Sequence, residues 1–107
     1  MRITIDSANV ELDDAMREHF ELRVRFALTR YSQQISRIVL HVENAIRPAG
    51  GFDVCCDVSV TLIFDDAVEV EVQDTEIHSA IARAVNRAGR AVERKLQERR
   101  GSGSRDK

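Results

Sequence analysis

The sequence predicts an α+β domain with the order β-α-β-β-β-α, in which a four-stranded sheet carries both helices on one face. Apolar residues alternate with polar ones, as in strands, over residues 2–6, 35–46, 52–64 and 68–73. Apolar residues recur at helical spacing after residue 13 and again after residue 77. The length of 107 residues is typical of one domain. We expect that domain over residues 1–100, followed by a flexible Gly- and Ser-rich tail at 101–107.

The N-terminal third reads as a short strand followed by a long helix. Ile3 and Ile5 lie on one side of the strand, and Asp13 is a typical helix cap. The helix then has a single apolar stripe, formed by Met16, Phe20, Val24, Ala27, Leu28 and Tyr31. Because a long helix suits a right-handed crossover between parallel strands, the first two strands should pair in parallel.

Two large apolar residues of this helix, Leu22 and Phe26, lie off its apolar stripe. One interpretation is that they pack under the "RPAGG" loop (47–51) or under the second helix. The other is that they form an exposed patch that pairs two copies of the chain or contacts a partner. The sequence does not choose between these interpretations.

Three strands with short links follow, and short links favour an antiparallel meander. The clearest strand is 52–64, in which Phe52, Val54, Cys56, Val58, Val60, Leu62 and Phe64 face one way. Every second residue of this strand and the next faces the opposite way, and many of them are acids. The open sheet face should therefore be wet and acidic, with Asp53, Asp57, Glu69 and Glu71 on it.

The second helix, residues 77–96, combines a buried side with a row of arginines. Ile81, Val85 and Val92 belong to its apolar side, whereas the arginines fall at 83, 87, 90 and 94. At about 100° per residue these four positions share an arc of roughly 60°, with no acid among them. Arg binds phosphate through a bidentate fork. This Arg stripe (Arg83, Arg87, Arg90 and Arg94) predicts a phosphate-binding surface, the alternative being a solvated helix face.

The net charge, the spacing of the cysteines and the length of the apolar runs argue against several classes of function. The net charge is only −2, so a basic surface has to be local. Cys55 and Cys56 are neighbours that point to opposite faces of a strand, and no metal-ligand spacing accompanies them. There is no nucleophile–base pair and no Gly-rich phosphate loop, which argues against an enzyme, a cofactor or a small-molecule substrate. No apolar run has the length of a signal peptide or a membrane span, so we expect a cytoplasmic protein.

Two segments resemble a known family. "NVELDDAMREHF" (9–20) and "EIHSAIARAVNRAGRAVERKL" (76–96) resemble the two helices of short-form ribosome hibernation-promoting factors, the ribosome-associated inhibitor or sigma-54 modulation protein family. The order of strands and helices is similar too. The chain departs from the family pattern at His78, Ala82 and Gly89.

The resemblance implies a fold like that of double-stranded-RNA-binding domains, and a function. It implies a bacterial stress-response protein that binds the small ribosomal subunit and silences translation. By matching position, rRNA phosphates would contact the Arg stripe (Arg83, Arg87, Arg90, Arg94) and, on the first helix, Arg23 and Arg30. Two alternatives stay open: a protein-interaction module or homodimer on the same fold, using Leu22 and Phe26, and a general double-stranded RNA binder.

Overall fold

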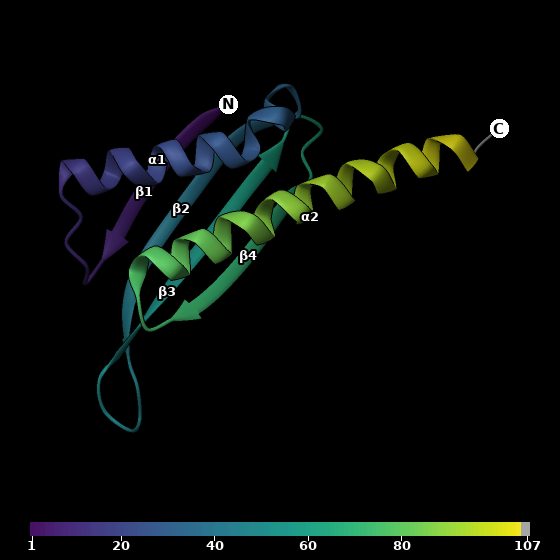
Figure 1. Ribbon diagram of the computed structural model, residues 1–107. Coiled ribbons are helices and arrows are strands. Elements are labelled where there is room, and N and C mark those ends of the chain that lie inside the picture. The colour runs from purple at the N-terminus through teal and green to yellow at the C-terminus, as the bar shows by residue number, and fades with distance from the viewer. Residues whose placement is uncertain (106–107) are drawn as a thin grey trace.

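The computed structural model describes the backbone of residues 1–105 and the side chains of residues 1–100. Its elements are β1 (Arg2–Ala8), α1 (Asp14–Leu28), the 3₁₀ helix η1 (Thr29–Gln34), β2 (Ile35–Ile46), β3 (Phe52–Leu62), β4 (Ala67–Asp74) and α2 (Ile77–Arg105). The four strands form one sheet in the order β1-β2-β3-β4. Both helices lie against the same face of this sheet (Figure 1). The α+β fold expected from the sequence is confirmed.

The strand pairing follows from the connections. β1 and β2 are parallel, because α1 carries the chain back across the sheet between them. β2 pairs with β3, and β3 with β4, in antiparallel register through short links. Residues that share a register position therefore form rows across the sheet. One such row on the helix-covered side is Ile5, Leu40, Val58 and Val70.

The core lies between the sheet and the two helices. Phe20, Val24 and Leu28 enter it from α1, while α2 adds several apolar side chains at helical spacing. Among the residues that the sequence places on apolar faces, the following are buried: Phe20, Leu28, Val58, Val60, Leu62, Ile81 and Val85. The expectation was wrong for Tyr31, which is half-buried. α1 ends at Leu28, and the tighter turn of η1 moves Tyr31 toward the edge of the helix layer.

The ends of the elements show which local signals act. The Asp13 carboxylate accepts a hydrogen bond from the Met16 backbone N–H at 2.8 Å, so Asp13 caps α1 as expected. The third strand, expected over 52–64, ends at Leu62, and Asp65 has φ +70° in the turn that follows. Phe52 was expected to face the core but is 60% exposed. It stands at the tip of the β2–β3 hairpin, which projects beyond the helices in Figure 1.

α2 is longer than the sequence predicts. It runs to Arg105, so residues 101–105, which the sequence places in the Gly- and Ser-rich tail, continue the helix. Residues 106 and 107 of that tail lie outside the described residues. Figure 1 shows the C-terminal part of α2 extending past the end of the sheet. The last turns of α2 therefore have no strand beneath them.

Candidate nucleic-acid interface

The four members of the Arg stripe are all exposed on α2. They lie opposite the apolar side of the helix, whose Ile81, Val85 and Val92 are at most 1% exposed. The spacing of four, three and four residues matches a helix of 3.6 residues per turn, so the guanidinium groups line up along one side. The sheet holds the other side of α2. Packing therefore fixes the direction in which the stripe faces.

The stripe is not electrostatically uniform. Arg83 donates to the Asp74 carboxylate at 3.2 Å and to the Gln73 carbonyl at 3.3 Å. The pKa of Asp74 is lowered, first by the hydrogen bond from the Glu76 N–H and then by Arg83. Among the residues with described side chains, Arg87, Arg90 and Arg94 form no salt bridge. These three guanidinium groups keep their donors for a ligand.

Only one of the two further arginines named from the sequence, Arg30, lines a hollow together with a residue of the stripe. Arg23 is exposed on α1, one turn before Ala27. Arg30 was expected on the first helix, but α1 ends at Leu28 and Arg30 lies in η1. Its guanidinium carbon is 5.5 Å from the centre of the Tyr31 ring. Arg30 and Arg90 line the same hollow, so a basic residue of η1 lies close to the stripe on α2.

That hollow, called here the helix groove, runs between the end of α1 and α2. It has a volume of about 360 Å³ and is lined by Phe26, Ala27, Arg30, Tyr31, Val85, Asn86, Gly89, Arg90 and Glu93. Gly89 has no side chain to fill it. A methyl group there would be 3.8 Å from the Ala27 carbonyl oxygen and from Leu28, which is ordinary contact. In the sequence, Gly89 is visible only as a departure from the family pattern, and its place beside a groove was not predicted.

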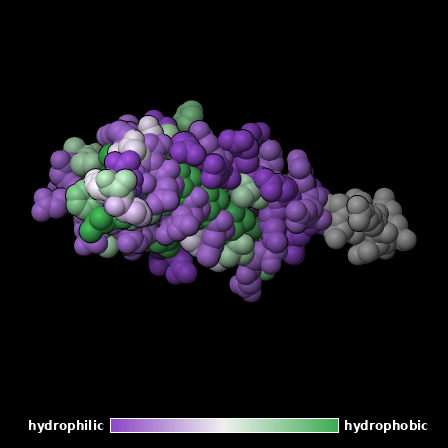
Figure 2. Space-filling model, turned by 90° about the horizontal axis from the view of Figure 1, so that it is seen from below, coloured by the Kyte–Doolittle hydropathy of each residue, from purple (hydrophilic) through white to green (hydrophobic). Residues whose placement is uncertain are grey.

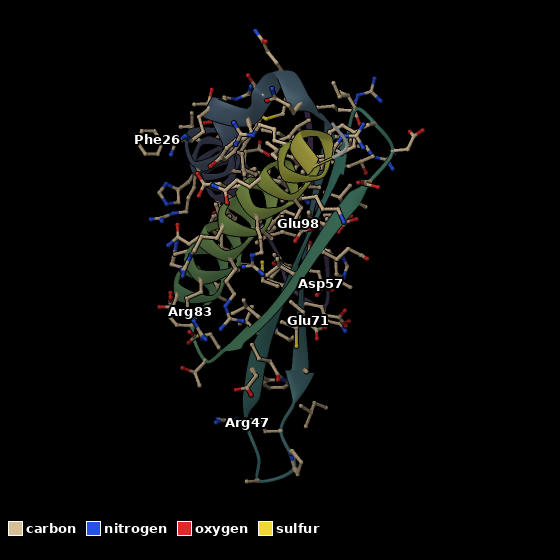
Figure 3. All side chains as sticks on the ribbon, turned by 90° about the vertical axis from the view of Figure 1, so that its right-hand side faces the viewer. Phe26, Arg47, Asp57, Glu71, Arg83 and Glu98 are labelled. Atoms are coloured by element: carbon tan, nitrogen blue, oxygen red, sulfur yellow. The ribbon has the colours of Figure 1, made fainter. Side chains whose placement is uncertain are left out.

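Leu22 and Phe26 are exposed, at 65% and 87%. The interpretation that they pack under the 47–51 loop or under the second helix is therefore wrong. Figure 3 shows Phe26 pointing outward, far from Arg47 of that loop. Phe26 forms part of the rim of the helix groove, beside Arg30 and Arg90. Whether the pair contacts a second copy or another partner stays a prediction.

The opposite face of the sheet is acidic. Asp6, His41, Asp57 and Glu71 occupy one register row across all four strands. Figure 3 shows Asp57 and Glu71 on the side of the sheet away from α2. His41 hydrogen-bonds Asp6 through Nδ1, and its Nε2 lies 3.3 Å from Glu43. The acids of this row would repel phosphate.

The remaining reactive groups do not form a site. Both cysteines are free, and burial raises the pKa of the Cys56 thiol to about 12. Within the described part of the chain, no group of His, Cys, Asp and Glu is arranged to hold a metal ion.

No described helix combines the length and apolarity needed to cross a membrane. The face seen in Figure 2 is mainly hydrophilic, with hydrophobic residues visible in its middle and at its left end.

Comparisons with known proteins agree with this architecture. A family model described as "Sigma 54 modulation protein / S30EA ribosomal protein" matches residues 3–100. The N-terminal domain of Protein Y from Thermus thermophilus has a TM-score of 0.70 and 23% identity, covering 88% of this chain and 98% of that domain. A ribosomal subunit interface protein from Coxiella burnetii has a TM-score of 0.70 and 15% identity, covering 90% and 99%. At these identities the two structures show a shared fold. No curated protein sequence matches significantly.

Proposed function

We propose that this chain binds the ribosome and silences translation, as hibernation factors do. The premise is that the chain belongs to the Sigma 54 modulation protein / S30EA ribosomal protein family. In this proposal the Arg stripe contacts small-subunit rRNA. The observation that carries the proposal is the set of Arg87, Arg90 and Arg94, which are exposed on one side of α2 and have no acidic partner among the described side chains. Arg30, across the helix groove from Arg90, extends this basic surface.

The charge distribution supports RNA binding in spite of the net charge of −2. The acids of β3 and β4 lie on the open sheet face, which also carries Arg2 and Arg37, whereas most arginines of the chain belong to the helices. A local basic surface attracts phosphates even when the whole chain is slightly acidic. Arginines also match phosphate geometry through their planar fork. The acidic face would orient the molecule, because only the helix side can approach RNA closely.

The names of the relatives support the ribosome as the partner. The Coxiella burnetii structure is described as a ribosomal subunit interface protein. The proposal makes this chain a binding protein of the bacterial cytoplasm, active in the stress response, with no catalytic step, cofactor or small-molecule substrate. Its effect on translation would come from occupying RNA surface that the working ribosome needs.

Sedimentation of a stationary-phase lysate through a sucrose gradient tests the proposal. The chain should co-migrate with small subunits or whole ribosomes, as detected by immunoblotting of the fractions. The signal should move to the top of the gradient when the salt concentration is raised before loading, because the contacts are electrostatic. A position only at the top of the gradient at low salt would refute ribosome binding.

A second candidate function is a protein-interaction module or homodimer on the same fold. It is favoured by the exposure of Leu22 and Phe26, at 65% and 87%. Sedimentation equilibrium of the purified chain separates this candidate from the first. A dimer that Phe26→Ser and Leu22→Ser convert to a monomer would support it. A wild-type chain that stays monomeric at high concentration would remove the homodimer.

A further inference from the structure

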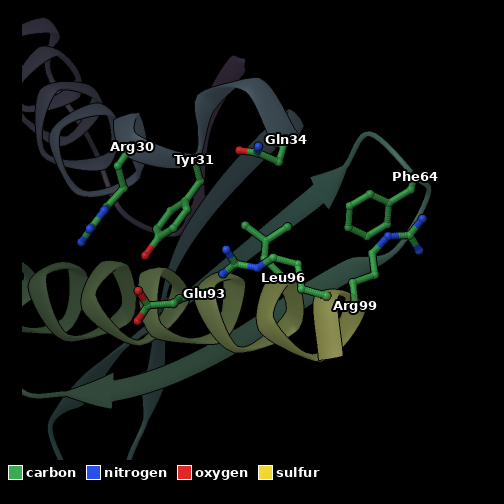
Figure 4. A pocket seen from close by; sticks show the side chains of 8 residues that line it. Arg30, Tyr31, Gln34, Phe64, Glu93, Leu96 and Arg99 are labelled. Atoms are coloured by element: carbon green, nitrogen blue, oxygen red, sulfur yellow. The ribbon is translucent and has the colours of Figure 1, made fainter. Parts of the chain in front are cut away.

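A second hollow, called here the η1 pocket, lies beyond the helix groove. It forms where η1, the turn after β3 and the C-terminal half of α2 meet, and its volume is about 550 Å³. That volume is within the range of roughly 300–1,000 Å³ found for ligand pockets. Figure 4 shows the side chains that line it: Arg30, Tyr31, Gln34, Phe64, Glu93, Leu96, Arg99 and Arg100.

The η1 pocket has the composition of a site for an unstacked base. The Arg99 guanidinium carbon is 3.7 Å from the centre of the Phe64 ring, and the Arg30 guanidinium carbon is 5.5 Å from that of Tyr31. Two aromatic rings, each beside a guanidinium group, therefore border one hollow. Bases stack on aromatic rings and on guanidinium planes, and the positive charge binds the attached phosphate.

Polar groups at the border of the η1 pocket can reach the edge of a base. In Figure 4 the Tyr31 hydroxyl points toward the Glu93 carboxylate. Burial and then a hydrogen bond to Glu93 raise the pKa of Tyr31, which keeps its hydroxyl protonated. Glu93 can accept a bond from a base amino group, and the Gln34 amide can both donate and accept. Leu96, partly buried between them, gives the pocket an apolar floor.

The η1 pocket is also joined to the proposed RNA surface. Arg30, Tyr31 and Glu93 line both the η1 pocket and the helix groove, and the groove contains Arg90 of the stripe. An RNA strand whose phosphates lie on the stripe can therefore reach the η1 pocket along Arg30 and Tyr31, where Glu93 is the one acid that lines both hollows. Three arginines and one acid surround the η1 pocket, so its lining is predominantly basic.

We propose that the η1 pocket holds a single unpaired nucleotide of an RNA strand. Its base stacks on Tyr31 and on the Phe64–Arg99 pair, and its phosphate binds Arg30 or Arg100. This inference rests on the proposed function and makes it more specific, because unpaired RNA becomes part of what the chain recognises. The same chemistry would fit a free nucleotide, so the test includes both ligands.

Intrinsic fluorescence gives a direct readout, because Tyr31 is the only tyrosine and the chain has no tryptophan. The full chain is titrated with a short single-stranded oligoadenylate, with an RNA duplex of the same length and with adenosine 5′-monophosphate. A base stacked on Tyr31 should quench its emission in a saturable way. The single strand should quench most strongly, since duplex bases stay stacked on each other.

Substitutions then locate the quenching. Phe64→Leu and Arg99→Gln should each weaken single-strand binding by at least about five-fold, because one stacking contact contributes about 1 kcal/mol or more. Phe52→Leu is the matched control: Phe52 is 60% exposed at the other end of β3, so its loss should leave the quenching unchanged. Arg99 is exposed, so Arg99→Gln keeps the test valid if Phe64→Leu unfolds the chain.

The outcomes separate this inference from the proposed function. A chain that sediments with ribosomes but shows no quenching, or whose quenching survives Arg99→Gln, would overturn the η1 pocket alone. Equal quenching by adenosine 5′-monophosphate would overturn the RNA strand as the ligand in favour of a free nucleotide. A chain that binds single strands at the η1 pocket but never sediments with ribosomes would refute the proposed function and keep the nucleotide site.

Discussion

At the scale of single residues, His41 has the most distinctive surroundings. It lies between Asp6 on β1 and Glu43 on its own strand, and bonds both carboxylates. Its pKa is raised, mainly by the hydrogen bond to Asp6, against the opposing effect of burial. Asp57, which shares the register row of Asp6 and His41, is the cross-strand neighbour of His41 on β3. No sequence pattern indicated the bond to Asp6, because it depends on the register between β1 and β2.

This geometry leads to a prediction about pH. A raised pKa means that folding favours the protonated ring, so His41 stabilises the fold below its unfolded-state pKa of about 6.5. That contribution is lost as the pH rises through the higher folded-state value. NMR titration should give His41 a pKa above about 6.5, and Asp6→Asn should lower it. An unchanged His41 pKa in Asp6→Asn would show that this bond does not act as described.

The cysteines give a second prediction at this scale. Burial raises the pKa of the Cys56 thiol to about 12. The pKa of the Cys55 thiol is also raised, first by burial and then by the nearby negative charge of Glu71. Because the thiolate is the reactive form, both thiols should be alkylated slowly by iodoacetamide near neutral pH. Half-buried Cys55 should react first, and Cys56 only after unfolding. Mass spectrometry of labelled peptides would measure this, and equal labelling of the folded chain would contradict it.

At the scale of elements, α2 contributes both to the core and to the candidate site. The same helical repeat buries Ile81, Val85 and Val92 and presents the Arg stripe on the opposite side. This much follows from the sequence, because both patterns obey one period. The helix groove and the η1 pocket do not. They depend on α1 ending at Leu28, on the tighter turn of η1, and on α2 extending past the end of the sheet. None of these three features has a clear periodic signal in the sequence.

Gly89 provides a prediction about α2 itself. Gly within a helix is less favourable than Ala by about 1 kcal/mol. An added methyl group would meet Ala27 and Leu28 at 3.8 Å, without a clash. Gly89→Ala should therefore raise the free energy of unfolding by up to about 1 kcal/mol, measured by urea denaturation. A destabilised variant would mean that the two helices approach more closely at this point than described.

The Arg stripe makes a prediction about salt. Each phosphate contact releases counterions from RNA, so the log–log slope of affinity against salt should be roughly −0.7 to −0.9 per contact. Neutralising two stripe residues, as in Arg87→Gln with Arg90→Gln, should make the slope shallower by roughly 1.4 to 1.8. Fluorescence anisotropy of the labelled chain with small subunits over a range of salt concentrations measures it. An unchanged slope would mean that these residues do not contact phosphate.

At the scale of the whole molecule, the design is a separation of charge across one sheet. The strand alternation puts Asp57 and Glu71 on the open face, while the helices carry the arginines on the other side. Fold and charge separation were predictable, because strand period, helix period and short links act locally. Tyr31 and Phe52 were misplaced for a common reason. Each lies where an element ends, and there tertiary packing rather than periodicity decides exposure.

The central claim is that the Arg stripe attaches this molecule to the ribosome. The most direct test is pelleting of small ribosomal subunits with the purified Arg87→Glu, Arg90→Glu double variant. Both residues are exposed on α2, so the fold should survive the change, as circular dichroism would verify. The control is Glu69→Gln with Glu71→Gln, two exposed acids of β4, which should not weaken binding. We expect the folded Arg variant to remain in the supernatant while the control pellets like the wild type. A folded Arg variant that pellets at wild-type occupancy would contradict the claim.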